Sequence, residues 1–412
     1  MTTHSDDVAH LAECSACRQR YAANVLPFDP AARRGREREF TSIAARLERE
    51  RDESTDVVAR YLRDTPPDEW SRLAEMPDLR NNAALEQMSE EVRRRLHRKP
   101  REALAIANLS ASIAESLAPS QYPSVMLAQL RGTAWKDRAS TLRYLARYDE
   151  ALEAAERGEE ALAPFAGLEN DRAVVGLVKG LIFLQTERFE EARAVLSECR
   201  RVFREHGDER RHVQAGIAEA SVLYTSSQYA EAQSIYIDVL RDAIAAGDTE
   251  SEARIHNNLA YCATHLGDYA QANIHFSEAV AKFTDLGFTS EVPRTERGAG
   301  LILIGRGQIA SGIAHLYAAR RDFIAADMIE EAGLCALNIA AVLVERGDDA
   351  GARLLMQNVI NEFTVAELDE RAIAAIVQLR NDIDVDDATG ETVRTVHAFI
   401  ETLQNARRDA NC

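Results

Sequence analysis

The sequence predicts an all-α fold, and three observations lead to that prediction. The 412 residues are rich in Ala, Leu, Glu and Arg and include only ten prolines, a composition that favours helix. Apolar residues recur at helical spacing, as in residues 254–283, where the letters LGDY separate two amphipathic stretches. This helix–turn–helix pattern then returns with a nearly constant period, which is typical of a solenoid of stacked helix pairs.

Six turn-plus-helix starts define the period. They read ARYDEA (146–151), ERFEEA (187–192), SQYAEA (227–232), GDYAQA (267–272), GQIASG (307–312) and GDDAGA (347–352). Their last positions lie 41 residues apart once and then 40 apart four times. Gly167, Gly207, Gly247 and Gly287 keep the step of 40. We expect each to close a second helix in the left-handed conformation, which costs glycine no Cβ strain.

The pattern resembles the tetratricopeptide repeat (TPR) family. Ala272 and Phe276 match the family's Ala-x3-Phe feature, and Trp135 matches its first-helix tryptophan. The resemblance covers residues 131–365 and implies a right-handed superhelical solenoid of helix pairs. The family's usual repeat has about 34 residues. The longer period here therefore predicts longer repeats, with the additional length at the end of each second helix.

Four segments flank the predicted array at 131–365. Residues 1–26 carry a predicted zinc-binding segment, and residues 27–79 form a charged helix and a linker with Trp70 as a packing anchor. Residues 80–130 are predicted to form a degenerate helical pair, with a proline in the first turn of its second helix. Residues 366–412 are predicted to be capping helices, because a solenoid needs a polar end.

The predicted zinc segment has the spacing His10-x3-Cys14-x2-Cys17. If Cys14 begins a helical turn, Cys17 follows one turn later on the same face, and His10 arrives from the turn before. A closed structural zinc site needs four such ligands in tetrahedral geometry. His4 is the nearest candidate for the fourth, and the two aspartates that follow it are weaker ones. A redox thiol pair and a segment without metal remain the alternatives.

Residues 10–21, HLAECSACRQRY, resemble the core of the zinc-containing anti-sigma domain of bacterial regulators. The resemblance implies that His10, Cys14 and Cys17 are zinc ligands. It also implies a sigma factor or another regulator as the partner, in transcriptional or stress regulation.

The charge of the chain argues against two classes of partner. A formal net charge of -18 repels nucleic acid and anionic membranes unless local patches oppose it. The strongest basic run, at 93–101, is predicted to be a solvated helix face beside two glutamates. No apolar run approaches the roughly 20 residues that span a bilayer, and the first ten residues lack the features of a signal peptide. These observations predict a cytoplasmic protein.

The sequence offers no set of residues for catalysis. It has no Gly-rich phosphate loop, and no Ser/His/Asp or Cys/His set has a suggestive spacing. Cys199, Cys262 and Cys335 fall on apolar helical faces and are predicted to be small core residues. We therefore expect a protein that is not an enzyme.

In the TPR family, the first helix of each repeat lines a concave groove. The resemblance then implies a partner-binding set formed by Lys136, Ser140, Arg143, Leu177, Leu181, Ile217, Tyr224, Arg254, Asn257, Tyr261, Arg294 and Arg297. Arg and Asn side chains can bind carboxylates or peptide backbone, so the set predicts an anionic or peptide-like guest. The alternative is that several of these residues pair with acidic side chains of neighbouring helices.

The sequence thus predicts a protein–protein interaction module, a regulatory scaffold or sequestering factor that binds a protein or peptide in the groove. A sensor that responds to a small molecule or peptide is the alternative. A zinc-dependent enzyme is a remote third, because a catalytic zinc needs an open coordination position and a general base nearby.

Overall fold

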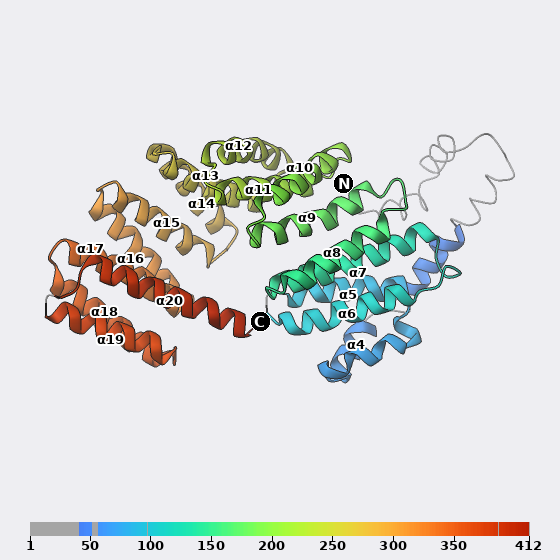
Figure 1. The fold of residues 1–412 in the computed structure, drawn as a ribbon, viewed down its shortest axis with the longest axis horizontal. Coiled ribbons are helices and arrows are strands. Elements are labelled where there is room, and N and C mark those ends of the chain that lie inside the picture. The colour runs from blue at the N-terminus through green and yellow to red at the C-terminus, as the bar shows by residue number, and fades with distance from the viewer. Residues whose placement is uncertain (1–40, 52–56, 97, 386, 412) are drawn as a thin grey trace. The chain divides into compact units, whose positions relative to one another are not determined.

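The computed structural model describes residues 41–51, 57–96, 98–385 and 387–411, in the last range with side chains to 403. This part of the chain is helical and contains no strand, which confirms the all-α prediction (Figure 1). After a helix at 41–51, the elements are α4 (Val57–Asp64), η1 (Pro67–Glu75), η2 (Pro77–Leu79), α5 (Asn82–Arg95), α6 (Pro100–Ser116), α7 (Ser124–Tyr144), α8 (Tyr148–Leu162), α9 (Glu169–Gln185), α10 (Phe189–Glu205), α11 (Glu209–Thr225), α12 (Tyr229–Ala246), α13 (Thr249–His265), α14 (Tyr269–Asp285), α15 (Glu291–Gly305), α16 (Ile309–Ala325), α17 (Ile329–Glu345), α18 (Asp349–Val365), α19 (Glu370–Asp384) and α20 (Gly390–Asn411).

The helices form two compact units, which divide within α11 between Ala215 and Gly216. In each unit, consecutive helices pack as neighbours, as the TPR resemblance implied. The predicted array at 131–365 spans this division, and the first repeat helix, α7, begins at Ser124, ahead of the predicted start.

The N-terminal unit begins with short helices packed around Trp70. This residue lies on the 3₁₀ helix η1 and is 2% exposed, and its indole Nε1 donates a hydrogen bond to the carbonyl of Thr65 at 2.9 Å. Burial of a large aromatic side chain with its one donor satisfied makes it a packing anchor. Pro100 opens α6, where its missing N–H costs no helical hydrogen bond.

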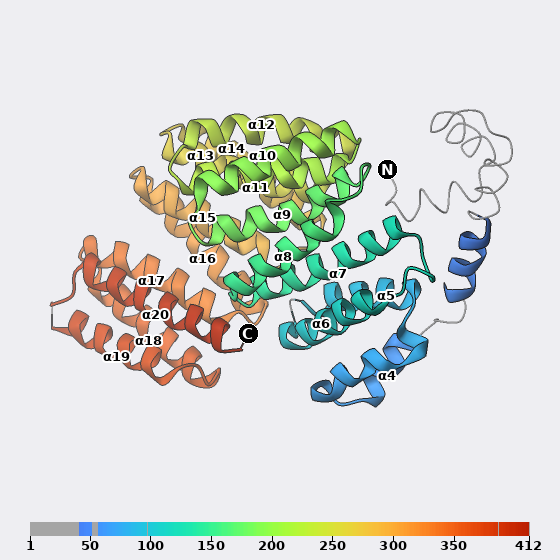
Figure 2. The same ribbon diagram turned by 45° about the vertical axis from the view of Figure 1, so that its right-hand side comes forward.

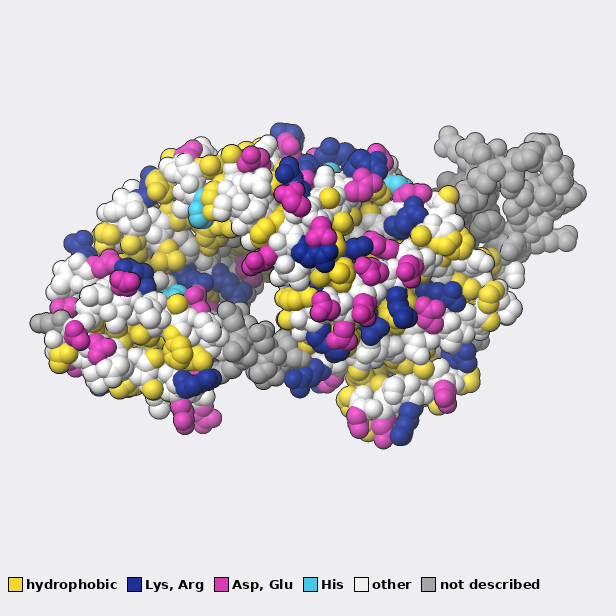
Figure 3. All heavy atoms as spheres, in the orientation of Figure 1, with side chains coloured by type: hydrophobic (Ala, Val, Ile, Leu, Met, Phe, Trp, Pro, Cys, Tyr) yellow, Lys and Arg dark blue, Asp and Glu magenta, His cyan; other side chains and the backbone are white. Residues whose placement is uncertain are grey.

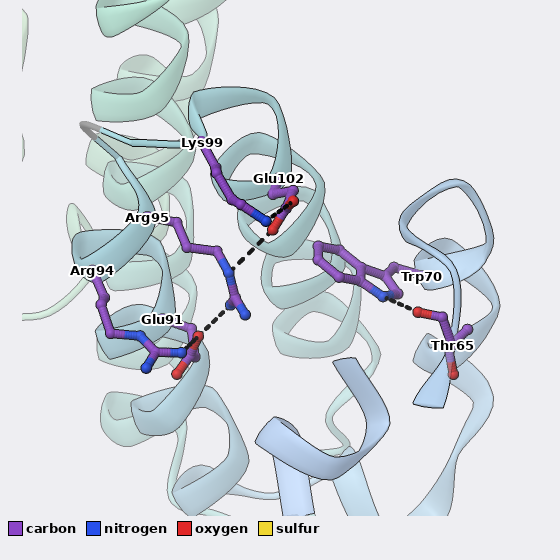
Figure 4. A network of polar contacts seen from close by, with 7 residues as sticks. All are labelled: Thr65, Trp70, Glu91, Arg94, Arg95, Lys99 and Glu102. Carbon is purple, nitrogen blue, oxygen red and sulfur yellow. Dashed lines mark hydrogen bonds and ion pairs between the residues drawn. The ribbon is translucent and has the colours of Figure 1, made fainter. Parts of the chain in front are cut away.

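Several cations of the basic run at 93–101 form ion pairs within the fold (Figure 4). Arg94 pairs with Glu91 at 2.8 Å, and Arg95 and Lys99 both reach Glu102, at 3.3 and 2.7 Å. These ion pairs hold three cations of the run beside two glutamates of the fold.

The repeats of the second unit are regular. Helices α13 and α14 each have 17 residues and are joined by residues 266–268. We expected the additional length at the end of the second helix. Instead, both helices of the pair have the same length.

Residues in the left-handed conformation lie in the turns after the helices of the repeats. Gly247 ends α12 with φ of 68°, and its own N–H and that of Asp248 bond to carbonyls of the last turn, at 3.1 and 3.0 Å. The four predicted glycines all have positive φ, although Gly167 lies beyond the end of α8 at Leu162. Five residues other than glycine also have positive φ, which strains their backbone. They are Ala146, Glu187, Ser227, Asp327 and Glu367.

The C-terminal helix α20 packs against α17, the first helix of the preceding pair (Figures 1 and 2). Val393 and Ile400 of α20 are buried, and Arg394 forms an ion pair with Glu345 of α17 at 2.6 Å. The terminal pair therefore covers the surface of α17 that a further repeat would otherwise cover.

Candidate binding face

The predicted partner-binding residues all lie on first helices of repeats. Within each unit, we call the side of these helices that carries them the A-face of that unit. The structure places three on α7, two on α9, two on α11, three on α13 and two on α15. All are half-buried except Arg254, which is exposed. Partial burial is the condition in which a side chain is held in place and still meets a guest.

In the N-terminal unit, the polar members of the set contact their own neighbours. Lys136 forms an ion pair with the adjacent Asp137, whose side chain is 4% exposed. Arg143 donates to Gln185 Oε1 of α9 at 3.1 Å, and burial lowers the pKa of its guanidinium. Leu177 packs against a buried apolar cluster that includes Phe203. Arg143 Nε and Asp137 Oδ2 nevertheless have no hydrogen-bond partner within the described residues.

In the second unit, the A-face begins with an aromatic cluster. Tyr224 Oη lies 3.0 Å from His265 Nε2, and the His265 ring stacks on Tyr229 with centroids 4.2 Å apart. The sequence predicts Tyr224 as a binding residue, whereas Tyr229 and His265 carry no signal of their own in it. His265 lies 41 residues after Tyr224, which is about one repeat, so the period could have suggested this contact.

The next two helices meet through Asn257 and Tyr261 of α13. Asn257 Oδ1 accepts a hydrogen bond of 3.4 Å from Thr295 of α15, and Tyr261 contacts Phe276 edge-on at 5.2 Å between centroids. A Cβ atom at Gly298 of α15 would lie 2.4 Å from Tyr261 Oη. Glycine is therefore needed there for the phenol to reach the backbone of α15.

The arginines of the A-face differ in their pairing. Arg254 pairs with Glu250 on its own helix at 3.1 Å. Arg294 pairs with Glu291 at 3.3 Å and approaches Glu331 of α17 at 3.9 Å. Arg297 has no acidic partner within the described residues. The alternative prediction was that these cations pair with acidic side chains of the chain itself. This is the case for Lys136, Arg254 and Arg294, and among the described residues it is not the case for Arg297.

A histidine pair joins α13 to its own second helix. The Nδ1 atoms of His256 and His275 lie 3.0 Å apart. Burial, together with the charge of the other ring, lowers the pKa of His256, and burial lowers that of His275. Both rings therefore favour the neutral form, in which one nitrogen donates and the other accepts.

The predicted zinc ligands His4, His10, Cys14 and Cys17 lie outside the described residues. Within the described part, no group of three or more His, Cys, Asp or Glu side chains is arranged to hold a metal ion.

The three internal cysteines are buried, as predicted, and burial raises the pKa of the Cys262 thiol to about 11. A thiol of this kind is unreactive at neutral pH. Among the described helices, none is long and apolar enough to cross a bilayer.

Comparisons with known proteins show which solved structures resemble this fold. No family model matches the chain. No curated protein matches it either. Among solved structures, a signal-transduction ATPase with numerous domains (STAND) and a tetratricopeptide repeat sensor, from Pyrococcus horikoshii, has a TM-score of 0.58 at 11% identity, and the match covers 100% of this chain and 66% of that chain.

The apo form of RapI has a TM-score of 0.54 at 15% identity, over 85% of this chain and 99% of that chain. A Rap protein complexed with competence and sporulation factor has a TM-score of 0.49 at 15% identity, over 83% and 99%. At these identities, the first two likenesses establish the fold. The chain has a TPR-like helical repeat architecture.

Proposed function

We propose that this chain is a non-enzymatic regulatory module that binds a protein or peptide segment along the A-face. The observation that carries the proposal is the row of half-buried amide, phenol and guanidinium side chains on α13 and α15, on a TPR-like scaffold. Such groups, held by packing, recognise the backbone and the charged groups of an extended chain. One structural neighbour uses a repeat array of this kind as a sensor, as its name states.

A peptide-capture experiment tests the proposal. The immobilised chain is incubated with a pool of randomised hexapeptides, and the retained peptides are identified by mass spectrometry. We expect selective retention by the unmodified chain and its loss in a Tyr224→Ala/Asn257→Ala variant. The matched control is Asp238→Ala/Arg241→Ala, which removes an exposed ion pair of 3.7 Å on the second helix α12. Equal retention by both variants would place binding elsewhere.

Hydrogen exchange separates the two versions of the function. A peptide or small molecule that acts on a sensor should protect a few adjacent repeats, whereas a protein partner should protect a long stretch of first helices. The exchange is measured on the complex and on the free chain, repeat by repeat.

We further propose that residues 1–26 hold a structural zinc ion and contact a regulator such as a sigma factor. The support is the ligand spacing of His10, Cys14 and Cys17. Metal content of the purified chain should be about one zinc per molecule. It should fall to background in a His10→Ala/Cys14→Ser/Cys17→Ser variant that keeps its helical circular dichroism. If anaerobically purified protein contains no metal, the zinc proposal is wrong. The A-face proposal does not depend on this result.

A further inference from the structure

The first helices of the second unit do not all expose the same positions. Because the period is 40 residues, Asn257 of α13 corresponds to Arg297 of α15 and to Leu337 of α17. Asn257 and Arg297 are half-buried, whereas Leu337 is 0% exposed. The other two A-face positions of α17 carry Leu334 and Ala341, which are also buried. The A-face of the second unit is therefore open on α13 and α15 and covered on α17.

Helix α20 provides this cover. It packs against α17 more closely than against α19, the helix that precedes it. Val393, Ile400 and Leu403 of α20 belong to the same buried apolar cluster as Leu334 and the other covered residues of α17. Their spacing of seven and three residues places them on one side of α20. An amphipathic helix of this chain thus occupies the α17 part of the A-face.

Two polar contacts fix the direction of α20. Arg394, near its start, pairs with Glu345 at the end of α17 at 2.6 Å. His397, one turn later on α20, has its Nε2 atom 3.3 Å from Nδ2 of Asn338, two turns earlier on α17. The two helices therefore run antiparallel, whereas the contacts between α13 and α15 advance together along both helices. α20 is thus not placed as the first helix of a further repeat, and it forms a separate segment on α17.

The covering helix also lies beside the open part of the A-face. Burial lowers the pKa of His397, the Glu401 carboxylate opposes this shift, and the positive charge of Arg297 on α15 adds to it. His397 is therefore within electrostatic reach of an A-face residue. Figure 3 shows His and Lys or Arg side chains gathered over α20 and the repeats beside it. A guest that continued along the A-face beyond α15 would meet α20.

The length of a guest decides whether it reaches α20. An extended chain advances about 3.3 Å per residue, and packed helices lie about 8–10 Å apart. Six extended residues therefore span about 20 Å, which is the distance across α13, α15 and α17. A bound hexapeptide needs the surface that α20 covers.

We propose that α20 is an autoinhibitory helix, which covers the α17 part of the A-face and is displaced as a unit by a guest that extends over α17. The proposal rests on the proposed function. α17 has ten buried residues, whereas α20 has four among those whose side chains the structure describes. α20 can therefore open while α17 stays folded. The free energy of this opening lowers the apparent affinity for every guest that needs the covered surface.

Hydrogen exchange on the full chain tests the displacement directly. Exchange is measured on the free chain and on its complex with the best retained hexapeptide. We expect the guest to slow the exchange of α13 and α15 and to speed that of α20 by about tenfold or more, because a displaced helix loses its protection. If α20 is instead a fixed end of the array, the guest will leave its exchange unchanged or slow it, and either result would overturn the proposal.

Two variants loosen α20 in the full chain. Ile400→Ser and Leu403→Ser each remove a buried apolar contact of this helix. The matched control is Phe399→Ser, which makes a similar change at a side chain that is 41% exposed on the same helix. Hexapeptide affinities are measured by fluorescence anisotropy. Leu403→Ser replaces Ile400→Ser as the deciding variant if the latter loses its helical circular dichroism.

We expect Ile400→Ser to bind hexapeptides about tenfold more tightly than the unmodified chain, because less free energy is needed to open α20. Leu403→Ser should change affinity in the same direction, and Phe399→Ser should bind like the unmodified chain. Unchanged or weaker binding in folded loosened variants would show that α20 is only a cap, and it would leave peptide binding on the A-face intact. Retention of no hexapeptide by any of these chains would overturn the proposed function itself.

Discussion

Gly333 in the interior of α17 allows a sharp test of how closely the helices pack. A Cβ atom at this position would lie 2.4 Å from Cε1 and 2.5 Å from Cζ of Phe363 on α18. Phe363 is fully buried, at 0% exposed, so its ring has no free space to enter. Replacing glycine by alanine within a helix favours folding by about 1 kcal/mol, and overpacking a core costs about 1–3 kcal/mol.

We therefore expect Gly333→Ala to lower the free energy of unfolding by up to about 2 kcal/mol, the steric cost exceeding the helical gain. The control is Gly305→Ala at the end of α15, where a Cβ would meet nothing within 4 Å. That variant should be as stable as the parent or more stable, because only the helical gain remains.

Urea unfolding followed by circular dichroism measures both variants, and hydrogen exchange of α17 and α18 localises the effect. Adding Phe363→Leu to Gly333→Ala should recover part of the loss, since the smaller side chain leaves room for the new methyl group. If Gly333→Ala proves as stable as Gly305→Ala, the close approach of α17 to Phe363 is not the reason for glycine at this position.

Two further predictions concern buried polar groups. Tyr236→Phe should cost about 1 kcal/mol, because the 2% exposed phenol loses its 2.9 Å hydrogen bond to Ser221; a urea midpoint equal to that of the parent would refute this. The pair His256 and His275 should make the fold less stable in acid. The charged groups that act on the two rings are Glu252, Glu278, Lys282 and Asp268. Their pKa values are lowered by folding, so the unfolded chain binds more protons below about 6.5. Stability should therefore be full above that pH and decline as the pH falls, and His275→Gln should flatten the decline in melting temperature between pH 7.5 and 5.5.

The repeat architecture was predictable because its signals are local. Apolar residues recur at helical spacing, and turns recur about every 40 residues. Both patterns depend on backbone conformations that are set by residues close together in the sequence. Gly207, Gly247 and Gly287 were recognised as left-handed for this reason. Ser227 and Glu367 take the same conformation without glycine. The residue types serine and glutamate do not predict a left-handed conformation. Only their position within the 40-residue period indicates it.

Contacts between repeats were harder to predict. The A-face residues could be placed on the correct helices from the alignment of repeats, but their pairing could not be. Arg294 and Arg297 lie three residues apart on one helix, and within the part of the chain that the structure describes only Arg294 has an acidic partner. Glu291 of the same helix pairs with Arg294 at 3.3 Å, and only the approach of Glu331 of α17 at 3.9 Å is a matter of how two helices pack.

The sequence by itself determined that the chain is helical and built from repeated pairs, because each repeat carries its own periodicity and turns. It also placed the candidate binding residues on first helices. Only the tertiary structure decided that α20 packs against α17, that Tyr261 reaches Gly298 and that Arg297 has no acidic partner among the described residues. These features join residues from different repeats, and their energies depend on distances of a few ångström between side chains. No pattern within a single helix records such distances.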